Sequence, residues 1–217
     1  RQILQHFFLH ARILADRNGT PFPSNYDDIL KKMLEYLAYL CQAGPPPRFG
    51  DDDGGRVFDG RRNRAEHLMD PLAIGTALYR VNAFKQPGVA VTEELLWLLG
   101  AEGLRRFTEC REWKSIRSAQ FPQTGLYISH AGEGSRSQVV LDAGPLGGGS
   151  GGHGHADALS LTLNLDGKPL LVDPGACCYV GPGPDRNHFR TTGAHNTVTV
   201  DGLSQAEPRT PFSWFRW

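Results

Sequence analysis

Histidines and aspartates gather around one glycine-rich part of the sequence. The stretch GGHGHADALS, residues 151–160, places His153 and His155 one residue apart, with an aspartate two positions later. Further along, Asp173 stands in an Asp-Pro-Gly sequence and His195 precedes Asn-Thr-Val. Two imidazoles and a carboxylate are a suitable zinc ligand set, with water or another group as the fourth ligand. Surface histidines beside a glycine loop are the alternative interpretation, and the default one from residue types alone.

The ends of β-strands would have to bring these side chains together. Residues 157–165 alternate strictly, with their leucines on one face, and Asp166-Gly167 favours a two-residue hairpin turn. The return strand ends at Asp173, and we predict another alternating strand from His195. Neighbouring strands could therefore carry His155, Asp173 and His195 to one place.

A flat hairpin does not achieve this directly. A two-residue turn pairs Leu165 with Lys168 and Ser160 with Asp173, so His155 lies further out along the chain. The chain before the strand must curl back, and its glycines allow that.

Apolar residues repeat with different spacings in the two halves of the chain. Apolar residues recur at helical spacing in the first half, and strand-like alternation with tight turns begins near Trp113. We predict an α+β protein with a helical domain at 1–110 and an antiparallel β-sandwich domain at 111–217. Ser24 is a candidate N-cap for the second helix. The predicted helices cover about 3–14, 29–41, 68–81 and 92–99, and the predicted strands about 125–131, 137–144, 157–165, 168–173 and 195–201.

Composition excludes several classes of partner. The chain has 217 residues, and 23 basic residues balance 23 acidic ones, so neither nucleic acid nor an anionic membrane is indicated. No apolar run is long enough to span a membrane. The first 19 residues do not resemble a signal peptide, because polar residues interrupt the apolar ones and a cleavage site is missing. The four cysteines contain no metal-binding or redox pair, and we predict free thiols, which leaves the compartment undecided.

Other charged residues offer weaker candidates. Asp51, Asp52 and Asp53 suggest a calcium loop by composition, but the spacing of an EF-hand is missing, which favours a capped or solvated turn. The basic residues that follow could meet a polyanionic glycan, although a solvated charged face is favoured; they are Arg56, Arg61, Arg62 and Arg64. His6 and His10 lie on the first predicted helix, where packing or solvation is the favoured interpretation.

Three motifs in order resemble the heparinase II/III-like polysaccharide lyases. They are HGHADALS, then VDPG after the hairpin, then HFRTTGAHNTVTVDG. LADRNGTPFP and GDDDGGR also look like the helical part of that family. The resemblance implies the C-terminal part of an α/α toroid at 1–110 and the N-terminal part of a sandwich at 111–217.

The resemblance also implies a function and a set of site residues. It implies β-elimination on an acidic, uronate-containing polysaccharide such as heparan sulfate or alginate, which leaves a 4,5-unsaturated sugar end. The zinc ligands implied are His155, Asp173 and His195, with His153 in catalysis or, alternatively, in support of the metal. Tyr179 is a second catalytic candidate, which could equally pack on the sandwich. Arg190 is a substrate-binding candidate, with a structural ion pair as the equal alternative.

Several properties follow from the resemblance only as expectations. The family's catalytic tyrosine and Asn/His pair are expected upstream of Arg1, so the chain is interpreted as a fragment that can be inactive alone. A periplasmic or secreted location is implied. The other function to consider is a non-catalytic, zinc-stabilised carbohydrate-binding or scaffolding module. The glycan, its sulfation and the oligomeric state stay open, a homo-oligomer included. Hydrolysis by two carboxylates has little support.

Overall fold

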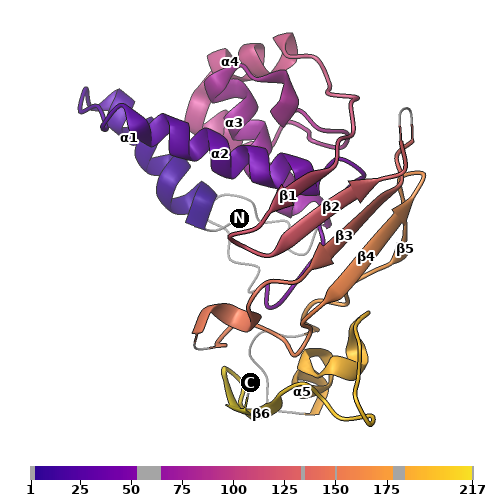
Figure 1. Ribbon diagram of the computed structural model, residues 1–217. Helices are drawn as coiled ribbons and strands as arrows, with labels where there is room; N and C mark the ends of the chain where they lie inside the picture. Colours follow the sequence, from indigo (N-terminus) through magenta and orange to yellow (C-terminus); the bar gives the residue numbers. More distant parts are fainter. Residues whose placement is uncertain (1–2, 53–64, 133–134, 150, 178–183, 217) are drawn as a thin grey trace. The chain divides into compact units, whose positions relative to one another are not determined.

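The computed structural model describes residues 3–52, 65–132, 135–149, 151–177 and 184–216 (Figure 1). The chain forms two compact units. The first combines Arg1–Pro46 with Gly54–Ile116, and the second combines Pro47–Asp53 with Arg117–Trp217. Helices come first and antiparallel strands second, which confirms the predicted α+β class. The toroid at 1–110 and the domain bounds at 110 and 111 stay predictions.

The described residues of the first unit contain four α-helices, and one of them forms its centre. A π-helical segment, Ile3–Leu9, leads into the first helix. Nearly every residue of α3 is buried, and Gly75 within it lets Leu34 of α2 approach closely. A side chain at Gly75 would lie 2.6 Å from a Leu34 methyl carbon, so the two helices pack through this glycine. The helices are α1 (His10–Arg17), α2 (Asn25–Leu40), α3 (Asp70–Tyr79) and α4 (Glu93–Glu109).

Two details of the helices differ from the predictions. Ser24 directly precedes α2, but its side chain makes no capping hydrogen bond because its backbone is already helical. The fourth helix does not end at Leu99. Gly100 takes φ 62° and ψ −156°, and the helix resumes beyond this kink to Glu109. A glycine can adopt that φ without strain, so it interrupts the helix without ending it. Among the described helices, none combines the length and apolar character that crossing a membrane requires.

A five-stranded antiparallel meander dominates the second unit (Figure 1). Its strands are neighbours in the sheet in chain order, from β1 to β5. A separate two-stranded sheet and one short helix follow. The bounds are β1 (Ala119–Phe121), β2 (Leu126–His130), β3 (Gln138–Asp142), β4 (Ser160–Leu165), β5 (Lys168–Leu171), α5 (Pro184–Arg190), β6 (Glu207–Thr210) and β7 (Ser213–Arg216).

The predicted hairpin between β4 and β5 is present. Asp166 and Gly167 both have positive φ, 50° and 78°, and Leu165 pairs with Lys168. The predicted pairing of Ser160 with Asp173 is wrong. An irregularity shifts the register between Leu163 and Asn164, and β5 already ends at Leu171. Asp173 is therefore in a loop that is free to turn towards the histidines.

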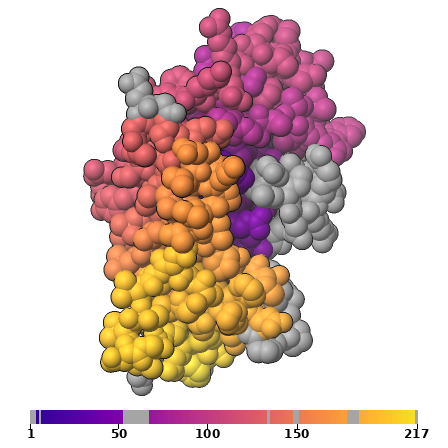
Figure 2. Space-filling view, turned by 90° about the vertical axis from the view of Figure 1, so that its right-hand side faces the viewer, coloured from indigo at the N-terminus to yellow at the C-terminus, as the bar shows by residue number. Residues whose placement is uncertain are grey.

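The leucines of β4 lie on one face, as predicted, but that face is not the buried one. Ser160 and Thr162 are buried, whereas Leu165 is 51% exposed. Thr162 continues a row formed by Ile128 and Val140 across the sheet. The β4–β5 hairpin, orange in Figure 2, lies at the molecular surface in that view. Alternation thus predicted the strand correctly, and the buried face of this strand carries Ser160 and Thr162 rather than the leucines.

The predicted strand from His195 is absent. A 3₁₀ turn, Thr192–Ala194, ends at His195, and the residues after it form bends with one isolated bridge between Val200 and Leu203. Thr197 donates its hydroxyl hydrogen bond to the carbonyl of Ala158. Such side-chain bonds to the backbone compete with a strand ladder.

Candidate metal centre and adjoining cavity

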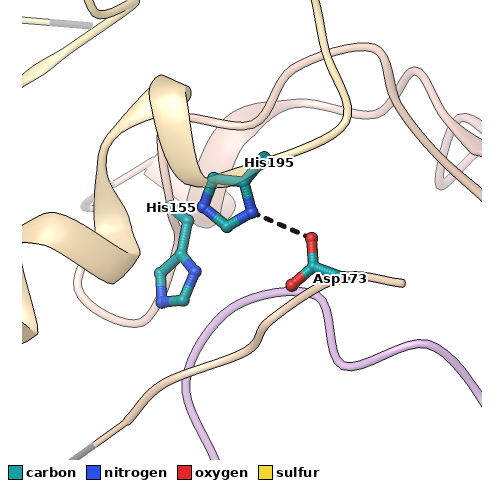
Figure 3. Close-up of side chains that lie close together, drawn as sticks. All are labelled: His155, Asp173 and His195. Atoms are coloured by element: carbon teal, nitrogen blue, oxygen red, sulfur yellow. Dashed lines mark hydrogen bonds and ion pairs between the residues drawn. The ribbon is translucent and has the colours of Figure 1, made fainter. Parts of the chain in front are cut away.

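Three side chains from separate segments converge in the second unit (Figure 3). His155 follows the glycine-rich loop, Asp173 follows β5, and His195 follows the 3₁₀ turn. Each offers one nitrogen or oxygen atom, and these atoms lie within 4.8 Å of one another. All three side chains are buried, with 0% exposure. The predicted convergence of these residues is therefore found in the structure; the ion itself stays a proposal.

Hydrogen bonds orient two members of the cluster. Nδ1 of His195 lies 2.9 Å from Oδ2 of Asp173, and Oδ1 of Asp173 accepts a 2.9 Å bond from the backbone N–H of Gly175. Burial lowers the pKa of His195, but the hydrogen bond and charge of Asp173 outweigh it, so the net pKa is raised. The Asp-Pro-Gly turn thus fixes the carboxylate, and the carboxylate fixes the imidazole.

Two buried nitrogens of the cluster have no partner. They are Nδ1 of His155 and Nε2 of His195. Buried polar atoms in proteins are nearly always hydrogen-bonded, so each exception needs an explanation. Neutral imidazole nitrogens and a carboxylate oxygen are zinc ligands. The residues therefore fit a zinc ion, and the two orphaned nitrogens are where its bonds would form.

Hydrogen bonds to backbone carbonyls hold the three segments against one another. The N–H of Ala156 donates to the carbonyl of Arg190 at 2.8 Å, and Thr192 donates its hydroxyl to the carbonyl of Ala156 at 2.7 Å. Asn196 donates its side-chain amide to the carbonyl of Val172 at 2.8 Å. Residues next to or near the candidate ligands thus connect the three segments by hydrogen bonds.

A buried carboxylate lies beside the cluster. The sequence predicts a capped or solvated turn at Asp51, with calcium binding as the weaker alternative, but the side chain of Asp51 is only 2% exposed, so a solvated position is wrong for this residue. Its Oδ1 lies 3.3 Å from Nε2 of His155, and Arg186 donates to both carboxylate oxygens at 3.0 and 2.7 Å. Burial raises the pKa of Asp51, but the bonds from His155 and Arg186 outweigh it and lower the pKa. Arg186 carries no motif that could have identified it in advance.

His153 lies at the mouth of a cavity. Its side chain is 69% exposed, and its Nδ1 is 3.6 Å from Oδ2 of Asp51. The cavity measures about 280 Å³ and is lined by His153, His155, Asp142, Asp157 and the glycine-rich loop. Burial, together with the charge of Asp173, raises the pKa of Asp157 to about 6 against the opposing effect of the histidines.

The remaining candidates have different surroundings. Arg190 is 1% exposed, donates to the carbonyls of Thr210 and Pro211 at 2.9 and 2.7 Å, and stacks 4.3 Å from the ring centre of Trp214. This packing favours the structural role of Arg190, and its contact with substrate stays a prediction. Nε2 of His10 lies 3.1 Å from a Glu94 oxygen, in agreement with a packed helix histidine. Tyr179, Asp53, Arg56, Arg61, Arg62 and Arg64 lie outside the described residues.

Comparison with known protein families finds a match that covers the β-rich half of the chain. Residues 114–217 match the model of the family described as Heparinase II/III-like, C-terminal. No curated protein matches the sequence significantly.

Several solved structures share the fold. A heparinase III gene product is 24% identical with a TM-score of 0.64, over 92% of this chain and 28% of that chain. Heparan sulfate lyase HepC from Pedobacter heparinus is 21% identical with a TM-score of 0.60, over 89% of this chain and 27% of that one. Another heparinase III is 17% identical, also with a TM-score of 0.60. The chain thus spans less than a third of the length of these structures, and at these identities the similarity shows the fold alone.

Proposed function

Because residues 114–217 belong to the heparinase II/III-like family, we propose that this protein is a polysaccharide lyase, or part of one, acting on an acidic, uronate-containing glycan. The reaction is β-elimination, which leaves a 4,5-unsaturated sugar end. Solved structures named heparinase III and heparan sulfate lyase share the fold, which supports this class of substrate. The observation that carries the proposal is the exposed His153 at a cavity next to the buried cluster.

The chemistry requires three tasks at the sugar. The carboxylate of the uronate must be neutralised, the C5 proton removed, and the leaving oxygen protonated. An imidazole can bind a carboxylate or transfer a proton near neutral pH. The cavity of about 280 Å³ lies just below the roughly 300–1,000 Å³ usual for ligand pockets. His153 is the exposed imidazole at this cavity, and we assign it the proton-transfer or carboxylate-binding role.

We further propose that His155, Asp173 and His195 hold zinc. When bound, the ion supplies positive charge and a crosslink between three chain segments. His155 and His195 contribute the two nitrogens that have no other partner. Asp173 contributes its carboxylate and keeps the imidazole of His195 in orientation through the 2.9 Å contact. The role of the site in this proposal is to organise the segments beside the cavity.

The lyase assignment is tested with the full-length protein. Heparan sulfate, alginate and related uronans are incubated with it, and ultraviolet absorbance detects the unsaturated product. Activity on none of these glycans would refute the lyase assignment and favour the non-catalytic binding module. The variant His153→Ala should lower turnover much more than thermal stability. Equal loss of both would move His153 to a supporting role.

The metal assignment has its own experiment. The variant His155→Ala should lose bound zinc and thermal stability, because metal binding is coupled to folding. His188→Ala is the matched control, since that histidine is exposed on α5. Zinc measured by elemental analysis should fall only in the first variant. Unchanged zinc content there removes His155 from the ligand set. A periplasmic or secreted location stays a prediction from the resemblance.

A further inference from the structure

His155 directs its two ring nitrogens to different partners. Its Nδ1 is buried without a hydrogen bond, while its Nε2 lies 3.3 Å from Oδ1 of Asp51. Figure 3 shows one ring nitrogen of His155 on the side of Asp173 and the other pointing away from it. A neutral imidazole has one N–H and one lone pair, and the hydrogen bond at one nitrogen determines which nitrogen keeps the lone pair.

The carboxylate of Asp51 is held firmly from the other side. Arg186 binds both of its oxygens and also donates to the carbonyl of Pro211 at 3.0 and 2.7 Å. The backbone N–H of Asp51 donates to the carbonyl of His153 at 2.9 Å. Both side chains of the Asp51–Arg186 pair are 2% exposed. Two-point contact of a guanidinium with a carboxylate fixes the orientation of both groups.

We propose that Asp51 is a positioning residue for the metal centre, which holds the hydrogen of His155 on Nε2 and so leaves the lone pair on Nδ1 for the ion. An ionised carboxylate can only accept, so the nitrogen facing it must donate. Metal-binding histidines commonly donate their second N–H to a carboxylate in this way, and loss of that partner typically weakens metal affinity 10–100-fold. This inference rests on the proposed zinc site. It adds Asp51, which lies 104 positions before His155 in the chain, to the residues that support the metal centre.

A purely structural role is the competing explanation. In that case Asp51 serves only to neutralise the buried charge of Arg186, and its removal destabilises the fold without changing zinc affinity. A buried ion pair that loses one partner typically costs about 3–5 kcal/mol. Stability alone therefore does not separate the two explanations, and zinc affinity must be measured on folded protein.

The test compares zinc affinity among full-length variants by competition with a chromophoric chelator. Asp51→Ala should weaken zinc binding 10–100-fold. Asp51→Asn should recover part of that loss, because its amide oxygen can still accept the Nε2 hydrogen. Asp142→Ala is the matched control, since it removes a carboxylate from the same cavity whose hydrogen bond goes to the N–H of Gly144. Its effect on affinity should be much smaller.

Each outcome decides the proposal. Equal affinity losses in Asp51→Ala and Asp142→Ala would show that only charge matters, and wild-type affinity in Asp51→Ala would leave only the structural role; either result overturns the inference. If the wild-type protein binds no zinc, the metal site and the role of Asp51 fall together, while the glycan assay still decides the lyase proposal. If Asp51→Ala does not fold, nitrogen NMR of the metal-free wild type decides. The proposal requires His155 to carry its hydrogen on Nε2 in that protein, and a hydrogen on Nδ1 would overturn it.

Discussion

The substitution Gly50→Ala tests the contact that places Asp51 beside His155. Gly50 has φ +76°, and a Cβ there would lie 2.6 Å from the backbone oxygen of His153. Alanine at positive φ costs about 1 kcal/mol. The clash adds about 1–3 kcal/mol because a backbone carbonyl cannot rotate away as a side chain can. Relief of the clash would also break the bond from the N–H of Asp51 to His153, worth about 1 kcal/mol.

The three costs add up to an expected loss of about 3–5 kcal/mol, and a matched control isolates the clash. Gly202 has a similar φ of +70° but open space around its Cβ position, so Gly202→Ala should cost only the conformational term of about 1 kcal/mol. Chemical denaturation of the full-length protein measures both losses. Hydrogen exchange at the Asp51 amide should accelerate about a hundredfold in Gly50→Ala and little in Gly202→Ala. Equal losses, with unchanged exchange at Asp51, would refute the close approach of these two segments.

Three further predictions concern other parts of the molecule. The hydrogen bond from Arg12 lowers the pKa of Asp27, against the effect of burial. Its stabilisation is therefore fully present above the ordinary value of 3.8 and lost as the pH falls through the lower folded value. Asp27→Asn should cost about 1 kcal/mol at neutral pH and nothing in strong acid, by denaturation at both pH values; a constant difference would contradict this. Thr92→Ala should cost about 1 kcal/mol by thermal denaturation, because its hydroxyl caps α4 at 3.1 Å, and an unchanged melting temperature would show that the cap is unimportant. Burial raises the pKa of the Cys41 thiol, whereas Cys177 is exposed. Iodoacetamide should therefore modify Cys177 in native protein and Cys41 only after unfolding, by mass spectrometry, and native labelling of Cys41 would refute its burial.

Local sequence patterns predict individual turns, helices and strands better than they predict the contacts between distant segments. The Asp166-Gly167 turn was predictable because its two residues favour positive φ, independently of the rest of the chain. The alternation after His195 predicted a strand wrongly, because side-chain bonds from Asn196 and Thr197 to distant carbonyls replace the ladder there. Propensity cannot foresee such tertiary contacts.

The candidate site was only partly accessible to sequence reasoning. The motifs predict His155, Asp173 and His195 as ligands, and the structure brings these three side chains together. For Asp51 the sequence favours a capped or solvated turn over a calcium loop, because the spacing of an EF-hand is missing. The burial of Asp51 depends on Arg186, which lies 135 positions away. No local pattern reports a pairing across that separation.

The short segment Pro47–Asp53 belongs to the second unit although it lies between two stretches of the first unit in the chain. This matters for the expression of the second unit as a separate protein. The family match begins at residue 114, which suggests a natural place to cut the gene. A recombinant piece starting there would lose Asp51 and leave the guanidinium of Arg186 buried without a counter-charge, at a cost of about 3–5 kcal/mol. Poor folding of such a piece would be a consequence of where it was cut, and supplying the short early segment in trans is the rational remedy.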